Sequence, residues 1–153
     1  MRKKINGTRL AEYIESELGG RVHLRDFTAQ GADPTSLIVR GPKDFDVFVN
    51  SGSSIQRQRL ELAHELGHFA LHTGRGKAAQ RDRKLTYNRY DDKPEDKEAD
   101  RFAIALLVPK GELEAQVEST NGNAVAIAKA FNVPIWLIVA RCQALGLELQ
   151  NID

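Results

Sequence analysis

The sequence predicts an α+β fold in which a small antiparallel three-stranded sheet packs against a mostly helical domain. Two observations lead to this prediction. Short extended segments separated by turn residues follow a first short helix, and apolar residues at helical spacing dominate from residue 55 onward. A chain of 153 residues normally folds around one core, so we expect a single domain. Its predicted parts are an N-terminal helix and sheet at 1–50, the helices carrying the candidate site at 51–109 and the C-terminal helices at 110–153.

The N-terminal part begins with an amphipathic helix at residues 8–18, which Gly19 and Gly20 end. Three short extended segments follow, at residues 22–27, 36–40 and 45–50. Asp33-Pro34 and residues 41–44 supply the turns between these segments. We therefore expect three antiparallel strands, which lead through the loop at residues 51–54 into a long helix.

That long helix carries the motif His64-Glu65-Leu66-Gly67-His68, an HExxH pattern. Residues four apart share one face of a helix, so His64 and His68 can hold one zinc ion together. Glu65 lies on the same side, where a carboxylate can act on a water molecule as the catalytic base. Three of the four histidines fall within residues 64–72, which a chance motif does not predict.

A third metal ligand is expected from the next helix, which Pro94 opens and which runs to about Val108. Glu98 is the predicted ligand, because an acid is unexpected at this position of a helix that needs much of its surface for the core, and because the small Ala99 and Ala103 would let this helix approach the motif helix closely. Asp100 and Glu95 are the alternatives, on other faces of the helix. Two imidazoles and one carboxylate with an open fourth position favour a single zinc ion.

Other polar residues near the motif have less defined roles. His72 lies one turn beyond His68, and we expect it near the metal but not among its direct ligands. Residues 74–93 contain seven Lys or Arg and three Asp, which indicates a solvated loop or a basic lip that selects an acidic partner. Tyr87 and Tyr90 within this stretch could reach the metal site, contact substrate or pack beneath the loop.

The C-terminal part predicts helices at residues 110–119, 124–131 and 134–145. The last two resemble a helix-turn-helix, but the residues from Ile135 to Ala140 are too apolar for a DNA groove. A packed helical hairpin is therefore expected, and the net charge of +1 also argues against direct nucleic-acid binding.

The composition agrees with a cytoplasmic protein. Cys142 is the one cysteine, so no internal disulfide can form. The N-terminus is basic but leads into no apolar run, and we see neither a signal peptide nor a membrane span.

Two motifs together resemble the ImmA/IrrE family of zinc metallopeptidases, of the gluzincin-like HExxH…E type. The first is residues 62–72, LAHELGHFALH, and the second is residues 98–109, EADRFAIALLVP. Residues 128–133 with Arg141 and residues 145–147 also fit, so the resemblance covers most of the chain from Arg57 onward. The second motif departs from the family pattern at Asp100, where Asn is usual, and at Val108, where Met is usual. We expect a minimal member of the family.

The resemblance implies a zinc-dependent endopeptidase that cleaves a helix-turn-helix repressor encoded nearby and so relieves repression. It also implies that His64, His68 and Glu98 bind zinc and that Glu65 is catalytic. An alternative is an HExxH protein that binds and modulates such a regulator, or a toxin–antitoxin partner, without cutting it.

Overall fold

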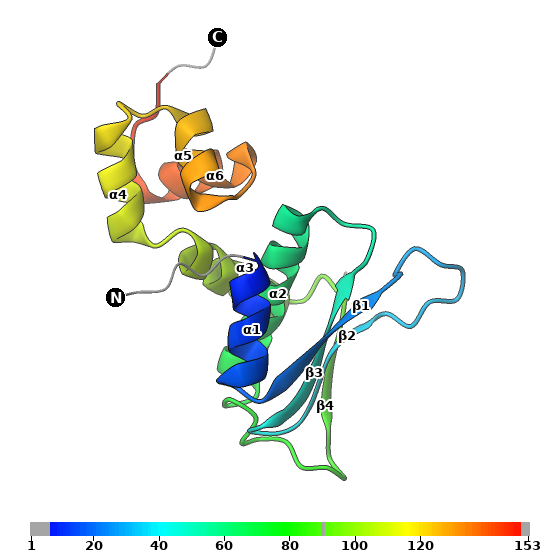
Figure 1. The fold of residues 1–153 in the computed structure, drawn as a ribbon. Coiled ribbons are helices and arrows are strands. Elements are labelled where there is room, and N and C mark those ends of the chain that lie inside the picture. Colours follow the sequence, from blue (N-terminus) through cyan, green and yellow to red (C-terminus); the bar gives the residue numbers. More distant parts are fainter. Residues whose placement is uncertain (1–6, 90, 151–153) are drawn as a thin grey trace. The chain divides into compact units, whose positions relative to one another are not determined.

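The fold was analysed in a computed structural model, which describes residues 7–89 and 91–150. Contacts between residues divide the chain into two compact units, Met1–Ala103 and Ile104–Asp153. The first unit holds the sheet and the HExxH helix, and the second is helical (Figure 1). The expectation of a single domain stays a prediction.

The sheet has four strands, not three, and it is mixed, not purely antiparallel. Its order is β1-β3-β2-β4, built from β1 (Gly20–Arg25), β2 (Thr35–Gly41), β3 (Asp44–Asn50) and β4 (Leu85–Asn88). β2 pairs antiparallel with both β3 and β4, whereas β1 pairs parallel with β3. The prediction of a three-stranded antiparallel sheet was therefore wrong on both counts.

Both differences come from pairings that are distant along the chain. Residues 42 and 43 join β2 to β3 as a tight hairpin, which leaves the far edge of β3 open for β1. β1 takes that edge and runs in the same direction as β3. β4 has only four residues and lies inside the basic stretch, where too few positions alternate to indicate a strand.

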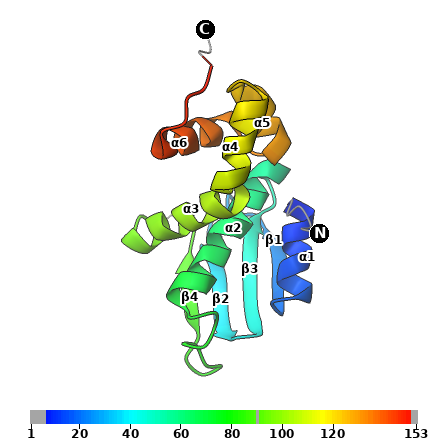
Figure 2. The same ribbon diagram turned by 90° about the vertical axis from the view of Figure 1, so that its left-hand side faces the viewer.

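Two helices of the first unit pack against one face of the sheet (Figure 2). They are α1 (Gly7–Ser16) and α2 (Ile55–His72), and the Ser54 hydroxyl caps α2 by accepting a hydrogen bond from the Arg57 N–H. The residues at their interface are fully buried: Leu10 and Ile14 from α1, and Leu37, Val39 and Phe45 from the sheet. The rings of Phe45 and Phe69 stack with centroids 4.1 Å apart, which fixes α2 on β3. α2, which carries the HExxH motif, is therefore anchored along the sheet.

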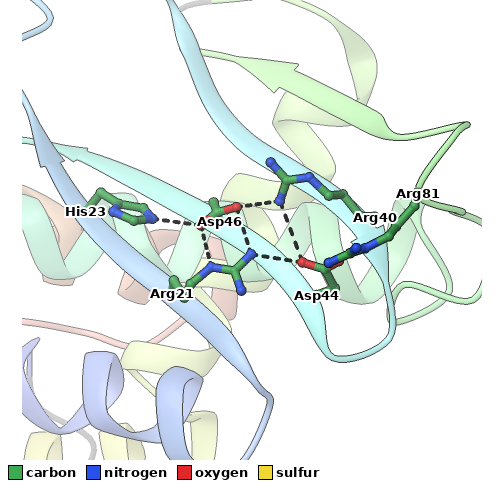
Figure 3. A network of polar contacts seen from close by, with 6 residues as sticks. All are labelled: Arg21, His23, Arg40, Asp44, Asp46 and Arg81. Carbon is green, nitrogen blue, oxygen red and sulfur yellow. Dashed lines mark hydrogen bonds and ion pairs between the residues drawn. The ribbon is translucent and has the colours of Figure 1, made fainter.

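The opposite face of the sheet carries a network of charges around Asp46 (Figure 3). Asp46 alternates with the inward-facing Phe45 and Val47, so its carboxylate points to this other face. It accepts hydrogen bonds from Arg21 at 2.8 Å and from Arg40 at 2.5 Å, and contacts the His23 ring at 2.7 Å. The neighbouring Asp44 pairs with Arg21 and, at 3.2 Å, with Arg81. Paired charges thus link β1, β2 and β3 with the segment that leads to β4.

The second unit contains the end of α3 (Pro94–Leu107) and three further helices. These are α4 (Lys110–Ser119), α5 (Ala124–Phe131) and α6 (Ile135–Leu145), close to the helices that the sequence predicts. Leu113, Ile127 and Leu137 are fully buried in it. Asn132, in the left-handed conformation, ends α5 before α6 begins. Within the described ranges, no single helix has the length and apolar character needed to cross a membrane; α5 and α6 meet that test only as a pair bent by 106°.

Candidate metal centre

α2 brings two imidazole rings together at the centre of the candidate site. His64 and His68 lie one helical turn apart, and their Nε2 atoms are 3.2 Å from each other. The His68 side chain is only 1% exposed, and the Tyr87 ring on β4 stacks on it with centroids 4.3 Å apart. The predicted pairing of the two histidines on one helix face is therefore present.

α3 approaches α2 closely because residue 67 of the motif is glycine. A Cβ atom on Gly67 would lie 3.0 Å from the Cα and carbonyl oxygen of Ala99, closer than real Cβ atoms normally come. Small residues at both positions thus let the two helix backbones nearly touch. An acidic side chain on this face of α3 can consequently reach the histidines.

The acid that faces the Nε2 atoms of both His64 and His68 is Asp96, in the first turn of α3. Its Oδ1 atom lies 3.0 Å from His68 Nε2 and 3.4 Å from His64 Nε2. In a tetrahedral site with metal–ligand bonds of about 2.0–2.1 Å, two ligand atoms are about 3.3 Å apart. The three atoms therefore fit one face of such a site, and they leave a fourth position for water or substrate.

Glu98, the ligand predicted from the sequence, occupies a different place. Its carboxylate is 48% exposed and lies 3.5 Å from His72 Nε2, and it is not part of the metal-binding groups found among the described residues. Residues two apart in a helix point in directions about 200° apart, so Asp96 and Glu98 cannot both face His64 and His68 in the same way. The geometry thus favours Asp96 over Glu98 as the third ligand.

A signal for Asp96 was present in the sequence. Asp96, Ala99 and Ala103 follow the spacing i, i+3, i+7, and both alanines are completely buried. The acid on the stripe of small residues is therefore the acid that faces α2. Glu95, Glu98 and Asp100 are the acids that the sequence predicts as possible ligands, and Asp96 is not among them.

The other ring nitrogens of the histidines also have partners. The Asp100 carboxylate accepts a hydrogen bond of 2.7 Å from His64 Nδ1. His68 Nδ1 lies 3.0 Å from Nδ1 of His72, which places His72 on the side of His68 away from His64 Nε2. In both rings the Nδ1 atom is engaged, which leaves Nε2 directed toward the place where a metal would bind.

Glu95 marks a second group of possible ligands. One ligand atom each from His68, His72 and Glu95 lie within 4.8 Å of one another. Glu95 is exposed, and His68 belongs to both groups. The three mutual distances of 3.0–3.4 Å among His64, His68 and Asp96 fit a single ion more closely.

Glu65 is buried beside the histidine pair, with only 5% of its surface exposed. Its Oε2 atom has no hydrogen-bond partner among the described residues. Burial raises the pKa of the Glu65 carboxyl to about 7, although the charge of His64 and a hydrogen bond from Ser36 lower it. A buried carboxylate oxygen without a partner costs free energy, so its retention indicates a chemical role.

The two imidazoles have different proton affinities in the absence of a metal. Burial lowers the pKa of both rings. For His64 the hydrogen bond to Asp100 and the nearby carboxylates outweigh burial, so its pKa is raised. For His68 burial and the charge of His64 prevail over Asp96, so its pKa is lowered. The more deeply buried ring, that of His68, is thus the one that is more readily neutral.

A cavity of about 330 Å³ adjoins the site. It lies between β4 and the start of α3, and His68, Tyr87, Asn88 and Asp96 are among the residues that line it. Tyr87, predicted near the site, lines this cavity and stacks on His68. Tyr90, the other tyrosine named from the sequence, lies outside the described residues.

Parts of the basic stretch pair with the first unit itself. Arg81 contacts Asp44 on β3, and Arg89 forms an ion pair with Glu61 on α2. The Arg89 guanidinium also lies over the ring of Phe27, 5.0 Å from its centroid. These contacts hold both ends of the β4 segment near α2 and the sheet. The expectation that this stretch selects an acidic partner stays a prediction.

Comparisons with known proteins give a family match and a similar fold. The Peptidase M78 family model, described as the IrrE N-terminal-like domain, matches residues 16–143. The fold is similar to that of a Mycobacterium tuberculosis transcriptional regulator, with a TM-score of 0.57 and 17% sequence identity. That similarity covers 92% of this chain and 40% of the regulator's chain, and at this identity it shows the fold alone. No curated protein matches the chain.

Proposed function

Because the chain belongs to the IrrE N-terminal-like family of metallopeptidases, we propose that it is a zinc-dependent endopeptidase that cleaves a helix-turn-helix repressor. Cleavage would relieve repression. The repressor as substrate comes from the family resemblance, whereas the chemistry of the site rests on this chain's own residues.

One observation carries the proposal: His64 Nε2, His68 Nε2 and Asp96 Oδ1 lie 3.0–3.4 Å from one another beside the buried carboxylate of Glu65. Two imidazoles and one carboxylate form the ligand set that catalytic zinc prefers, with one position left open. A bound zinc ion would polarise the scissile carbonyl and make the attacking water more acidic.

Glu65 acts as general base and then as general acid. Its carboxylate takes a proton from the attacking water, whose oxygen bonds to the carbonyl carbon of the scissile peptide. The same proton then passes to the leaving nitrogen as the C–N bond breaks, which yields a carboxylic acid and an amine; the acid's proton then moves to the amine, so the products near neutrality are a carboxylate and an ammonium group. The carboxylate of Glu65 is buried beside the histidine pair and its Oε2 atom has no hydrogen-bond partner among the described residues, so this oxygen can accept the proton.

The cavity beside β4 accommodates the substrate. β4 is an edge strand, so its outer backbone groups can pair with an extended peptide. A peptide placed there passes His68 and Asp96, which line the same cavity. We therefore expect a cleavage site in an extended or unfolded segment of the repressor.

The test combines the zinc-loaded protein with purified helix-turn-helix repressors encoded beside its gene, and mass spectrometry identifies the fragments. Wild-type protein should cut at one defined bond, and a chelator should abolish the cut. Glu65→Gln should retain zinc and slow cleavage by about 10²- to 10⁴-fold, the usual contribution of a general base.

Two outcomes would contradict the proposal. Equal cleavage by Glu65→Gln and wild type would remove Glu65 from the mechanism. A stable complex with a repressor that is never cut, with or without zinc, would favour the non-cleaving alternative.

A further inference from the structure

We infer that α3 orients both metal-binding histidines through their outer ring nitrogens, with Asp100 acting directly on His64 and Glu98 acting on His68 through His72. These three are positioning residues, and the inference rests on the metal centre proposed above. It gives Glu98 a role that differs from direct metal binding.

Two carboxylates of α3 contact the two ring nitrogens of His64. Asp96 faces its Nε2 atom at 3.4 Å, and Asp100, one turn further along α3, accepts a hydrogen bond from its Nδ1 atom at 2.7 Å. A carboxylate can only accept a hydrogen bond, so the proton of the neutral ring resides on Nδ1. Nε2 is then the unprotonated atom, which is the form that a metal needs.

The outer nitrogen of His68 contacts a carboxylate of α3 indirectly, through the ring of His72. Its Nδ1 atom lies 3.0 Å from Nδ1 of His72, and Nε2 of His72 lies 3.5 Å from the Glu98 carboxylate. Nε2 of His72 is buried and forms no hydrogen bond with the described residues. The Glu98 carboxylate is the charged group that lies within ion-pair distance of this nitrogen. The ring of Tyr87 stacks on His68 and limits its rotation.

These contacts contribute more to metal affinity than to folding. The Asp100 carboxylate is 64% exposed, and exposed ion pairs add little to the free energy of unfolding. Outer partners of metal-binding histidines, in contrast, typically change metal affinity by about 10- to 100-fold. A positioning role therefore predicts a loss of zinc affinity in a protein that folds normally, whereas a merely structural role predicts no such loss.

The experiment measures zinc affinity by competition with a chromophoric chelator, and urea unfolding of the metal-free proteins accompanies it. Asp100→Ala should bind zinc about 10- to 100-fold more weakly than wild type and unfold at nearly the same urea concentration. Asp100→Asn retains an acceptor oxygen and should recover part of the affinity. Glu98→Gln should show a smaller loss, because its 3.5 Å contact is longer.

Two controls separate the inference from the proposed metal centre. Glu15→Gln removes an exposed carboxylate from α1 and should leave zinc affinity unchanged. His64→Ala should remove the site. If wild type binds no zinc, or His64→Ala binds it equally well, both the metal centre and the inference are overturned. If those two behave as expected while Asp100→Ala matches wild type, the inference alone is overturned.

Discussion

Asp96 and Glu98 are two residues apart on α3, yet their carboxylates have different neighbours. Asp96 is the acid that faces both Nε2 atoms, and one of its oxygens also accepts a hydrogen bond from the Lys93 N–H at 3.2 Å. This second bond holds the carboxylate at the N-terminus of the helix, where a negative charge is favourable. At the scale of the residue, the side of α3 that meets α2 thus determines which acid, Asp96 or Glu98, faces the two Nε2 atoms.

Asp96→Ala should therefore lose zinc far more severely than Glu98→Ala. Removal of a direct ligand should cost more than the roughly 100-fold upper range of an outer partner. Isothermal titration of the metal-free proteins with zinc checks the difference. If Glu98→Ala loses zinc binding completely while Asp96→Ala retains it, Glu98 is the third ligand, as the sequence predicts.

At the scale of the element, the site depends on how closely α2 and α3 approach. Gly67 allows the approach because the atoms nearest to its missing Cβ belong to the Ala99 backbone, which cannot move as a flexible side chain can. α3 carries Asp96 and Asp100, so a shift of this helix moves both carboxylates relative to the histidines of α2.

Gly67→Ala should destabilise the protein and weaken zinc binding together. Overpacking costs about 1–3 kcal/mol, which exceeds the gain of about 1 kcal/mol from replacing a helical glycine. Gly111→Ala on α4 is the matched control, because no atom lies within 4 Å of its added Cβ. That control should be neutral or slightly stabilising, with unchanged zinc affinity. Urea unfolding and zinc titration of both variants measure this, and a Gly67→Ala protein with native stability and affinity would contradict the close packing.

At the scale of the whole molecule, the charge network opposite the helices links β1, β2 and β3. Hydrogen bonds from Arg21, Arg40 and His23 hold the pKa of the Asp46 carboxyl well below its usual range, despite the opposing effect of burial. The folded protein therefore binds this proton more weakly than the unfolded chain does. It follows that Asp46 contributes stability above the ordinary aspartate pKa of about 3.9 and that this contribution is lost as the pH falls below it.

Asp46→Asn should lower the free energy of unfolding at pH 7 by about 1–3 kcal/mol, the range for removing a charged partner from buried hydrogen bonds. The difference between wild type and variant should shrink as the pH falls from about 5 to 3. Urea unfolding of the metal-free proteins across this range tests the prediction. A difference that is constant with pH would show that the charge of Asp46 does not stabilise the sheet.

A feature of this molecule is predictable from the sequence when residues that are close together along the chain determine it. The spacing of His64 and His68 is local, and the helix that carries them is therefore predictable from its own residues. The same holds for the helices at 110–119 and 124–131, whose bounds agree with the structure. The parallel pairing of β1 with β3 and the addition of β4 depend on distant segments, and no local pattern indicates them.

The acid opposite the two histidines belongs to the same class of non-local features. Which acid lies there depends on the crossing of two helices at Gly67, and a shift of two residues on α3 exchanges Asp96, which faces both Nε2 atoms, for Glu98, which lies beside His72. The buried stripe of Ala99 and Ala103 indicates which side of α3 faces α2. The same alanines also predict the close approach of the two helices, yet from the sequence Glu98 is the acid expected opposite the histidines.

The central claim is that His64, His68 and Asp96 bind one metal ion. Crystals of the zinc-loaded protein measured on both sides of the zinc absorption edge test it most directly. We expect one anomalous peak within about 2.0–2.2 Å of Nε2 of both histidines and of an Asp96 carboxylate oxygen. A peak bound instead by Glu98 or by Glu95 and His72, or no ordered zinc near His64 and His68, would contradict the account.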